Sequence, residues 1–384
     1  MKENMKKGIY IVWGFNDHNA NSKPLTGIEK KILAQIESLN IPSLISCKLI
    51  VIPSLGKRLY LKKFLTYLFI DNYRNYGIED NSIDYIYIRR FVPTNYGLIQ
   101  LLKRIKIKNP LCKILYEIPT YPYEKEHYDS IKNYVILLID RFYRKKLIKY
   151  VDRVITLSND DRIFGINTIR IRNGIKCSNN PVVSHEYNNF KTKKEINLIA
   201  VAYFSFWHGY ERLIEGLYIY YNKSNTKYEV NLHFCGDGDQ LKKYKSLVQK
   251  YNLTNHVKFY GALSGDDLTR VYNNCDIGIC SLGSHRKNIY LSSELKSREY
   301  LARGLPIVSS AKVDCLPDDF EFCMYVPEDE SAVNVNQIVN FYERVYINNG
   351  FGRVHALIRS FAEKNVDISK TMQPVIDYII NSIE

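Results

Sequence analysis

Apolar-rich segments of strand length alternate along this chain with segments whose apolar residues recur at helical spacing. The strand-like segments lie at residues 8–15, 47–53, 84–91, 113–118, 152–157, 169–175, 196–204, 230–235, 256–263 and 275–282. The first of them, GIYIVWGF, is a continuous apolar run, which is typical of a central strand of a parallel sheet that is buried on both faces. The pattern therefore predicts an α/β protein, and its two similar series of strands and helices fit two Rossmann-like β/α/β domains with a cleft between them.

The two series are separated by residues 176–195, which are polar and show no periodicity. A chain of 384 residues also exceeds what one hydrophobic core commonly supports. We therefore predict an N-terminal domain at residues 1–177, a linker at 178–194 and a C-terminal domain at 195–362.

Residues 294–310, ELKSREYLARGLPIVSS, carry the strongest chemical signal in the chain. Ser292 and Ser293 ahead of this segment are candidate N-caps for a helix. Gly304 is a candidate residue just past the helix end, and Pro306 cannot continue the helix. The segment therefore predicts a short helix that leads into a buried strand.

Three charged residues of this helix suit a nucleotide diphosphate. Lys296 and Arg298 add positive charge to a helix N-terminus, where a phosphate group binds favourably. The Glu299 carboxylate can accept two hydrogen bonds from a vicinal diol such as that of a ribose. The alternative interpretation is a surface helix with a solvated charged face.

The sequence SREYLARGLPIV at 297–308 resembles the donor-site helix of GT-B glycosyltransferases, specifically glycosyltransferase family 4 (glycosyl transferases group 1) of the bacterial surface-polysaccharide type. The resemblance is specific over residues 195–310 and covers the first half of the chain in outline. It implies the GT-B fold, with a C-terminal helix at about 363–384 that crosses back onto the N-terminal domain. It also implies a hexosyltransferase that acts on a nucleotide sugar with retention at the anomeric carbon and without a metal.

The resemblance assigns a donor-binding set in the second half of the chain. The family commonly has two cations after the first strand of this domain, where Tyr203 and His208 stand here, and a glutamate where Leu291 stands. Lys296 is the predicted catalytic residue that stabilises the leaving nucleotide. The predicted donor-binding residues are His208, Gly209, Gly236, Gly238, Leu263, Lys296, Arg298 and Glu299.

Candidate acceptor-side residues follow the strand predicted at 113–118. Because active sites of open α/β sheets lie beyond the carboxyl ends of the strands, Glu117 is a candidate catalytic residue and Tyr121 and Tyr123 are candidate acceptor-loop residues. Gly27, a candidate acceptor-loop residue, matches a glycine at a helix start in the family, where the loop approaches the acceptor or the donor phosphates. The alternative for Glu117 is a structural ion pair with a buried Arg or Lys, and both interpretations stay open.

The net charge of +14 predicts attraction to anions such as nucleic acid, anionic lipid or phosphorylated substrates. Basic residues beside apolar ones in the first 150 residues favour a membrane surface, although each block also fits an amphipathic helix packed on the sheet. No nucleic-acid module has a recognisable signature here. The basic residues concerned are Lys57, Arg58, Lys62, Lys63, Lys103, Arg104, Lys106, Lys108, Arg144, Lys145 and Lys146.

Eight scattered cysteines without a CxxC pair are typical of reduced residues in a cytoplasmic protein. The N-terminal segment is interpreted as a strand and not as a signal peptide, and no segment has the length of a membrane span. We therefore expect a cytoplasmic protein, peripheral at the inner face of the cell membrane, with no metal and no cofactor besides the donor substrate.

Together these observations predict a retaining glycosyltransferase of bacterial cell-surface polysaccharide biosynthesis. Its expected partners are a nucleotide sugar, a lipid-linked or oligosaccharide acceptor and an anionic membrane surface, and no nucleic acid. One alternative is a non-catalytic GT-B partner subunit or glycan-binding protein. A second alternative, a nucleic-acid binder, depends only on the charge.

Overall fold

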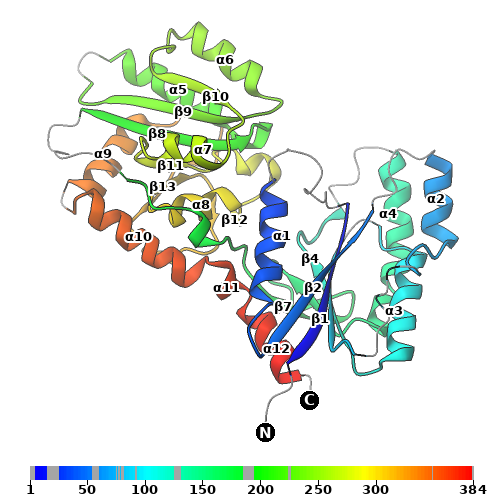
Figure 1. Ribbon diagram of the computed structural model, residues 1–384. Coiled ribbons are helices and arrows are strands. Elements are labelled where there is room, and N and C mark those ends of the chain that lie inside the picture. The colour runs from blue at the N-terminus through cyan, green and yellow to red at the C-terminus, as the bar shows by residue number, and fades with distance from the viewer. Residues whose placement is uncertain are drawn as a thin grey trace. The chain divides into compact units, whose positions relative to one another are not determined.

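The computed structural model describes residues 5–14, 26–53, 60–74, 76, 78, 82–90, 93–124, 131–184, 194–223, 226–347 and 349–382. The chain divides into two compact units (Figure 1). Unit 1 comprises Met1–Arg172 with Thr371–Glu384, and unit 2 comprises Asn173–Lys370. Each unit contains a mainly parallel sheet with helices packed on it, which confirms the predicted α/β fold class.

Unit 1 contains a seven-stranded sheet in the order β2-β1-β3-β4-β5-β7-β6. All neighbouring strands are parallel except β6, which runs antiparallel to β7. The strands are β1 (Lys6–Trp13), β2 (Ile45–Ile52), β3 (Tyr85–Arg89), β4 (Lys113–Ile118), β5 (Arg153–Thr156), β6 (Arg162–Ile163) and β7 (Ile166–Arg170).

Successive side chains of these strands point to opposite faces of the sheet. Ile9 and Ile11 of β1 join the main apolar cluster of unit 1, which includes residues of three helices. Tyr10 points the other way and donates a hydrogen bond to Gln35. The helices are α1 (Gly27–Ser38), α2 (Tyr60–Phe69), α3 (Tyr96–Lys108), α4 (Ile131–Arg144) and α12 (Gln373–Ser382), with a 3-10 turn, η2 (Leu147–Lys149).

Unit 2 contains a six-stranded parallel sheet in the order β10-β9-β8-β11-β13-β15. Two further strands of this unit, β12 and β14, form a separate parallel pair. The strands are β8 (Glu195–Tyr203), β9 (Glu229–Asp237), β10 (Val257–Gly261), β11 (Ile277–Ile279), β12 (Leu291–Ser292), β13 (Ile307–Ser309), β14 (Lys312–Val313) and β15 (Cys323–Tyr325).

The helices of unit 2 enclose a single large apolar cluster around this sheet. They are α5 (Tyr210–Tyr221), α6 (Leu241–Lys250), α7 (Gly265–Tyr272), α8 (Leu295–Ala302), α9 (Val335–Tyr346), α10 (Phe351–Asn365) and α11 (Ile368–Thr371), with 3-10 turns η3 (Cys177–Asn179), η5 (Phe206–His208) and η6 (Ser284–Lys287). Among the described residues, none of the helices combines the length and apolar character needed to cross a membrane.

The C-terminal segment differs from the single helix predicted at about 363–384. It is divided into the end of α10, the short α11 and α12. The break occurs because Asp367 forms a parallel β-bridge with Ile175, which interrupts the helical hydrogen bonds. Only the part from Thr371 onwards belongs to unit 1, where α12 contacts β7.

Candidate functional site

A cluster of polar side chains lies at the carboxyl ends of β8 and β11, which are neighbours in the sheet of unit 2. Carboxyl ends of parallel strands meet at one edge of a sheet, and this edge is where open α/β sheets bind ligands. Three segments contribute: η5 with the start of α5, the loop after β11, and the start of α8. The cluster comprises His208, Tyr210, Ser281, Glu294 and Lys296.

Lys296 lies at the centre of this cluster, and only 11% of its side chain is exposed. Its Nζ atom is 3.2 Å from the Tyr210 hydroxyl, 3.5 Å from Ser281 Oγ and 3.5 Å from Glu294 Oε2. These contacts fix the ammonium group in one position at the first turn of α8. A helix N-terminus already favours anions, so this position concentrates positive charge.

Glu294 is the N-cap residue of α8, although its side chain makes no capping bond to the helix. One carboxylate oxygen accepts a hydrogen bond from the Ser281 N–H at 3.0 Å and the other from the Ser281 hydroxyl at 2.7 Å. Burial alone would raise the pKa of this carboxyl, but the Lys296 ammonium and the Ser281 hydrogen bonds outweigh it and lower the pKa. The prediction of Ser292 or Ser293 as N-cap was wrong, because Ser292 ends β12.

His208 is buried and cannot supply the positive charge that the family has at its position. Its Nδ1 atom accepts a hydrogen bond from the Ser205 N–H at 2.9 Å, and its ring stacks on Tyr210 at 5.4 Å. Burial, with a further contribution from the Lys296 ammonium, lowers the pKa of His208 to about 2. The ring is therefore neutral at physiological pH, and its proton is on Nε2, where it can be donated to a ligand.

Gly209 allows the η5 segment to approach the loop after β11 closely. Its φ of +61° is left-handed, and a Cβ atom there would lie 2.7 Å from the backbone nitrogen of Gly283. The Leu282 N–H donates to the His208 carbonyl oxygen at 2.7 Å, which fixes this contact. Any larger residue at 209 would separate the two segments that carry the cluster.

Arg298 does not lie in the cluster, which corrects its predicted role at the diphosphate. Its side chain is 0% exposed, and its guanidinium forms an ion pair with Asp314 and a hydrogen bond to the Asn173 carbonyl oxygen. At about 100° per residue, Arg298 points roughly 200° around the helix from Lys296. Two cations separated by two positions cannot serve one face of a helix.

Glu299 lies three positions after Lys296, on a neighbouring part of the helix surface. It is partly buried and close to Arg303 and Tyr272. Burial lowers the pKa of Arg303, while the negative charge of Glu299 opposes that shift. The predicted contact of Glu299 with a ribose stays a prediction.

The predicted glycines Gly236 and Gly238 form a tight turn after β9. Their φ values are +147° and +141°, and Cβ atoms would lie 1.8 Å from the Ala202 carbonyl oxygen and 2.4 Å from the Phe204 nitrogen. Both positions therefore require glycine for backbone packing against the end of β8. Leu263 packs against the core of unit 2, and donor binding by these three residues stays a prediction.

The candidate residues Glu117, Tyr121, Tyr123 and Gly27 belong to unit 1. The Tyr123 side chain is 1% exposed, and its hydroxyl donates to Asp140 at 2.5 Å. Tyr121 is partly buried, whereas Gly27 is exposed at the start of α1. The buried Tyr123 therefore stabilises the loop. Acceptor contacts of Tyr121, Tyr123 and Gly27 stay predictions.

Glu117 lies in a buried polar network, with 1% of its side chain exposed. It accepts hydrogen bonds from Arg89 at 2.5 Å and from the Tyr87 hydroxyl at 3.0 Å, and the Lys31 ammonium is 3.7 Å away. Burial alone would raise its pKa, but Arg89 and Lys31 outweigh burial and lower it. This geometry matches the structural ion pair that the sequence left open as an alternative.

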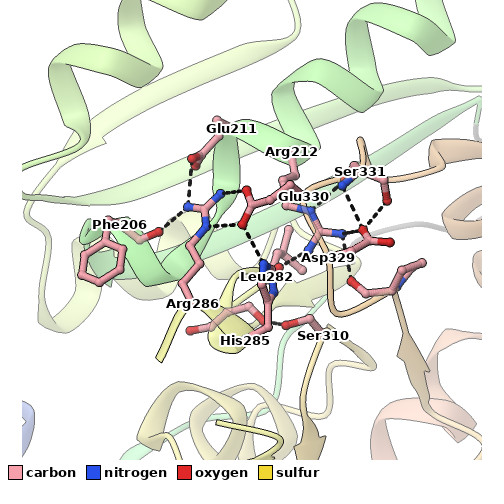
Figure 2. A network of polar contacts seen from close by, with 12 residues as sticks. Phe206, Glu211, Arg212, Leu282, His285, Arg286, Ser310, Asp329, Glu330 and Ser331 are labelled. Carbon is pink, nitrogen blue, oxygen red and sulfur yellow. Dashed lines mark hydrogen bonds and ion pairs between the residues drawn. The ribbon is translucent and has the colours of Figure 1, made fainter. Parts of the chain in front are cut away.

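A second network fixes the loops that surround the cluster (Figure 2). Arg286 of η6 donates to Glu330 and Glu211, and also to the Phe206 carbonyl oxygen of η5. Buried Arg212 of α5 donates to the backbone carbonyl oxygens of Leu282, Pro327 and Ser331. The network connects η5 and η6 with the loop between β15 and α9 through hydrogen bonds and ion pairs, and so fixes the positions of η5 and η6.

Sequence reasoning missed three members of the cluster: Tyr210, Ser281 and Glu294. Tyr210 follows His208-Gly209 at a helix start, and Ser281 follows an apolar strand. Their positions in the sequence could therefore have indicated that both lie near the predicted donor site. Glu294 lies three positions after Leu291, which stands where the family commonly has a glutamate. Among the described residues, no three His, Cys, Asp or Glu side chains gather closely enough to hold a metal ion.

The cluster lies within a part of the chain that matches a known family. Residues 185–319 match the family described as glycosyl transferases group 1. No curated protein matches this chain in sequence.

Several solved structures share the fold over nearly the whole chain. A glycosyltransferase from Rickettsia africae has a TM-score of 0.62 and 15% identity, covering 99% of each chain. Sucrose-phosphate synthase from Thermosynechococcus elongatus has a TM-score of 0.59 and 15% identity, covering 98% of this chain and 100% of the other. Anabaena HepE in complex with UDP and glucose has a TM-score of 0.54 and 14% identity, covering 97% and 99%.

The fold is that of GT-B glycosyltransferases, as the similar solved structures show. The match to glycosyl transferases group 1 coincides with the unit that carries the Lys296 cluster. The predicted GT-B fold and the resemblance of residues 185–319 to glycosyl transferases group 1 are therefore confirmed.

Proposed function

We propose that this chain is a retaining, metal-independent hexosyltransferase of glycosyltransferase family 4 that uses a nucleotide-diphosphate sugar. The observation that carries the proposal is the Lys296 ammonium, held at the first turn of α8 by Tyr210, Ser281 and Glu294. This cluster lies in the segment that matches the family. In the reaction, the anomeric carbon exchanges its bond to a diphosphate oxygen for a bond to an acceptor hydroxyl oxygen, and the hydroxyl proton passes to the departing diphosphate.

The chemistry follows from charge development on the leaving group. As the bond to the sugar breaks, negative charge grows on the diphosphate, and a fixed cation nearby stabilises that state. Lys296 and the N-terminus of α8 supply positive charge without any rearrangement. The neutral His208 adds a hydrogen-bond donor at Nε2, and Glu299 binds the ribose diol.

The acceptor that we propose is a lipid-linked saccharide, in bacterial cell-surface polysaccharide assembly at the cytoplasmic face of the membrane. The net charge of +14 supports an anionic surface as partner. One protein of similar fold, with a TM-score of 0.54 and 14% identity, is described as the lipopolysaccharide outer core galactosyltransferase WaaB. HepE is described in complex with UDP-glucose, so UDP-sugars are the first donors to test.

We expect one of UDP, GDP or ADP to raise the melting temperature of the protein, and the matching nucleotide sugar to be consumed.

Glu299→Ala should weaken binding of that nucleotide by about 10- to 100-fold, because a charge-assisted hydrogen bond contributes roughly 1.5–3 kcal/mol. Calorimetric titration measures the change, with the exposed Glu328→Ala as the control. Equal nucleotide affinity in Glu299→Ala and wild type would remove Glu299 from the site. Nucleotide binding without transfer from any sugar donor would instead favour a non-catalytic partner subunit.

We expect activity to persist in EDTA, with retained configuration at the anomeric carbon of the product. The only Asp-x-Asp pair suggested by the sequence is engaged in the turn after β9. There Asp237 accepts a hydrogen bond from the Gly238 N–H at 2.7 Å, and Asp239 accepts one from the Tyr203 hydroxyl at 2.9 Å. Product NMR assigns the anomer. Activity that disappears in EDTA and returns with Mg²⁺, or an inverted product, would contradict this mechanism.

A further inference from the structure

We propose that the outer surface of α2 and α4 in unit 1 is a membrane-docking face whose apolar side chains enter an anionic bilayer. The inference rests on the proposed membrane location and names the surface that would produce it. We call this surface the α2–α4 face, and define it by Leu65, Phe69, Ile131, Leu138 and Phe142.

The apolar residues of α4 that define the face form one stripe. Ile131 is 86% exposed, Leu138 is 45% exposed and Phe142 is 58% exposed. At about 100° per residue, the three lie within roughly 40° of one another around the helix axis. Leu137 and Tyr143, on other sides of the same helix, are buried in the core of unit 1. The stripe is therefore the outward side of an already packed helix.

The neighbouring helix α2 extends this surface. Leu65 is 44% exposed and Phe69 is 67% exposed, whereas Tyr67 between them is buried in the core. The Tyr143 hydroxyl of α4 donates to the Leu68 carbonyl oxygen of α2 at 2.5 Å, so the helices lie side by side (Figure 1). Each of the two neighbouring helices buries one side in the core of unit 1 and exposes apolar side chains on another.

Positive charge borders this apolar surface. Lys62 and Lys145 are exposed, and the Lys146 ammonium lies 4.8 Å from the centre of the Phe142 ring. The sequence of α2 contains no Asp or Glu, and the one acidic residue of α4, Asp140, is 0% exposed. An apolar stripe flanked by lysines is typical of helices that lie in the interface of anionic membranes. A second copy of the chain would instead bring like charges together.

The structure also changes which basic residues can contribute. Arg104 pairs with Asp71, and Lys106 pairs with Asp152 at 2.8 Å. Arg144 pairs with Glu124 at 2.6 Å. These three ion pairs hold unit 1 together, so part of the basic cluster predicted from the sequence serves the fold. Lys57 and Arg58 lie outside the described residues.

Flotation of the full chain with vesicles tests the proposal. Wild type is expected to float with phosphatidylglycerol–phosphatidylcholine vesicles and to remain below with phosphatidylcholine alone. The double variant Leu138→Gln/Phe142→Gln should lower the fraction bound at least tenfold. Lys145→Glu/Lys146→Glu should also lower it and should weaken its salt dependence. The matched control is Ile347→Gln/Leu357→Gln in unit 2, whose side chains are 46% and 45% exposed.

The proposal is wrong if wild type does not float with anionic vesicles, or if the Leu138→Gln/Phe142→Gln variant floats as well as wild type. It is also wrong if the unit 2 control loses as much flotation as this variant. A wild-type dimer that dissociates in the Leu138→Gln/Phe142→Gln variant would overturn it as well, because the face would then be a dimer interface. Unchanged melting temperatures establish that the variants fold. Consumption of the nucleotide sugar without vesicles should be equal in all variants. Flotation without any sugar-transfer activity would refute the proposed function alone, and activity without flotation would refute the docking face alone.

Discussion

Replacement of Lys296 by alanine is expected to lower the kcat for sugar transfer by about 100- to 1,000-fold, the usual effect of removing one fixed donor from a developing anion. The ammonium lies between Tyr210, Ser281 and Glu294, and the structure gives it no other ion-pair partner in the described part of the chain than Glu294. Its loss leaves only the N-terminus of α8 and the Nε2–H donor of the neutral His208 to stabilise the leaving diphosphate. Initial rates at saturating donor measure the effect.

The matched control is Lys242→Ala, since Lys242 is an exposed lysine on α6 of the same unit. This control should retain wild-type kcat and melting temperature. Lys296→Ala should keep its fold, because the carboxylate of Glu294 retains both hydrogen bonds from Ser281. A decrease of less than threefold in the kcat of folded Lys296→Ala would exclude a role for this ammonium in the chemical step.

Replacement of Glu117 by alanine is expected to destabilise unit 1 by about 3–5 kcal/mol, because it leaves buried positive charge without its partner. The Arg89 guanidinium forms an ion pair with this carboxylate, and the Lys31 ammonium lies 3.7 Å from it. Urea unfolding measures the change, with the exposed Asp160→Ala in the same unit as the control. If the unfolding midpoint is unchanged while kcat falls, Glu117 is catalytic and the structural interpretation is wrong.

The pH dependence of stability gives a second readout for the same carboxylate. The pKa of Glu117 is lower in the folded protein, where Arg89 and Lys31 outweigh burial. Its contribution is therefore complete above the unfolded-state pKa of about 4.3 and is lost as the pH falls through the folded-state pKa. Wild type should lose more stability than Glu117→Gln on acidification from about pH 7 to about pH 3.

The strands and the turns that require glycine were accessible from the sequence, because both depend on local rules. β1 and β8 are rich in apolar residues, and Gly304, predicted just past the end of the helix, has a left-handed φ of +80° after α8. The site was accessible only in part. Lys296 was a candidate, and Arg298 was placed beside it by its charge alone, although a separation of two positions, about 200° around a helix, already puts the two residues on different sides.

Two further differences arise from tertiary contacts that no local pattern contains. Glu294 acquires its role from Ser281, which lies on a different strand loop. Glu117 acquires its partners from β3 and α1, which contribute Arg89 and Lys31. Which residues meet in such long-range ion pairs depends on the order of the strands in the sheet. The sequence pattern predicted the class of fold but not this strand order.

The discontinuity of unit 1 has a consequence for the order in which the chain can fold during its synthesis. Unit 1 needs residues 371–382, since α12 contacts β7, the Arg153 guanidinium lies 5.0 Å from the centre of the Tyr378 ring, and Gln35 donates to the Met372 sulfur at 3.7 Å. Unit 2 is one uninterrupted stretch that ends at Lys370. On the ribosome, the unit that is begun first is therefore completed last, after all residues of unit 2 have been made.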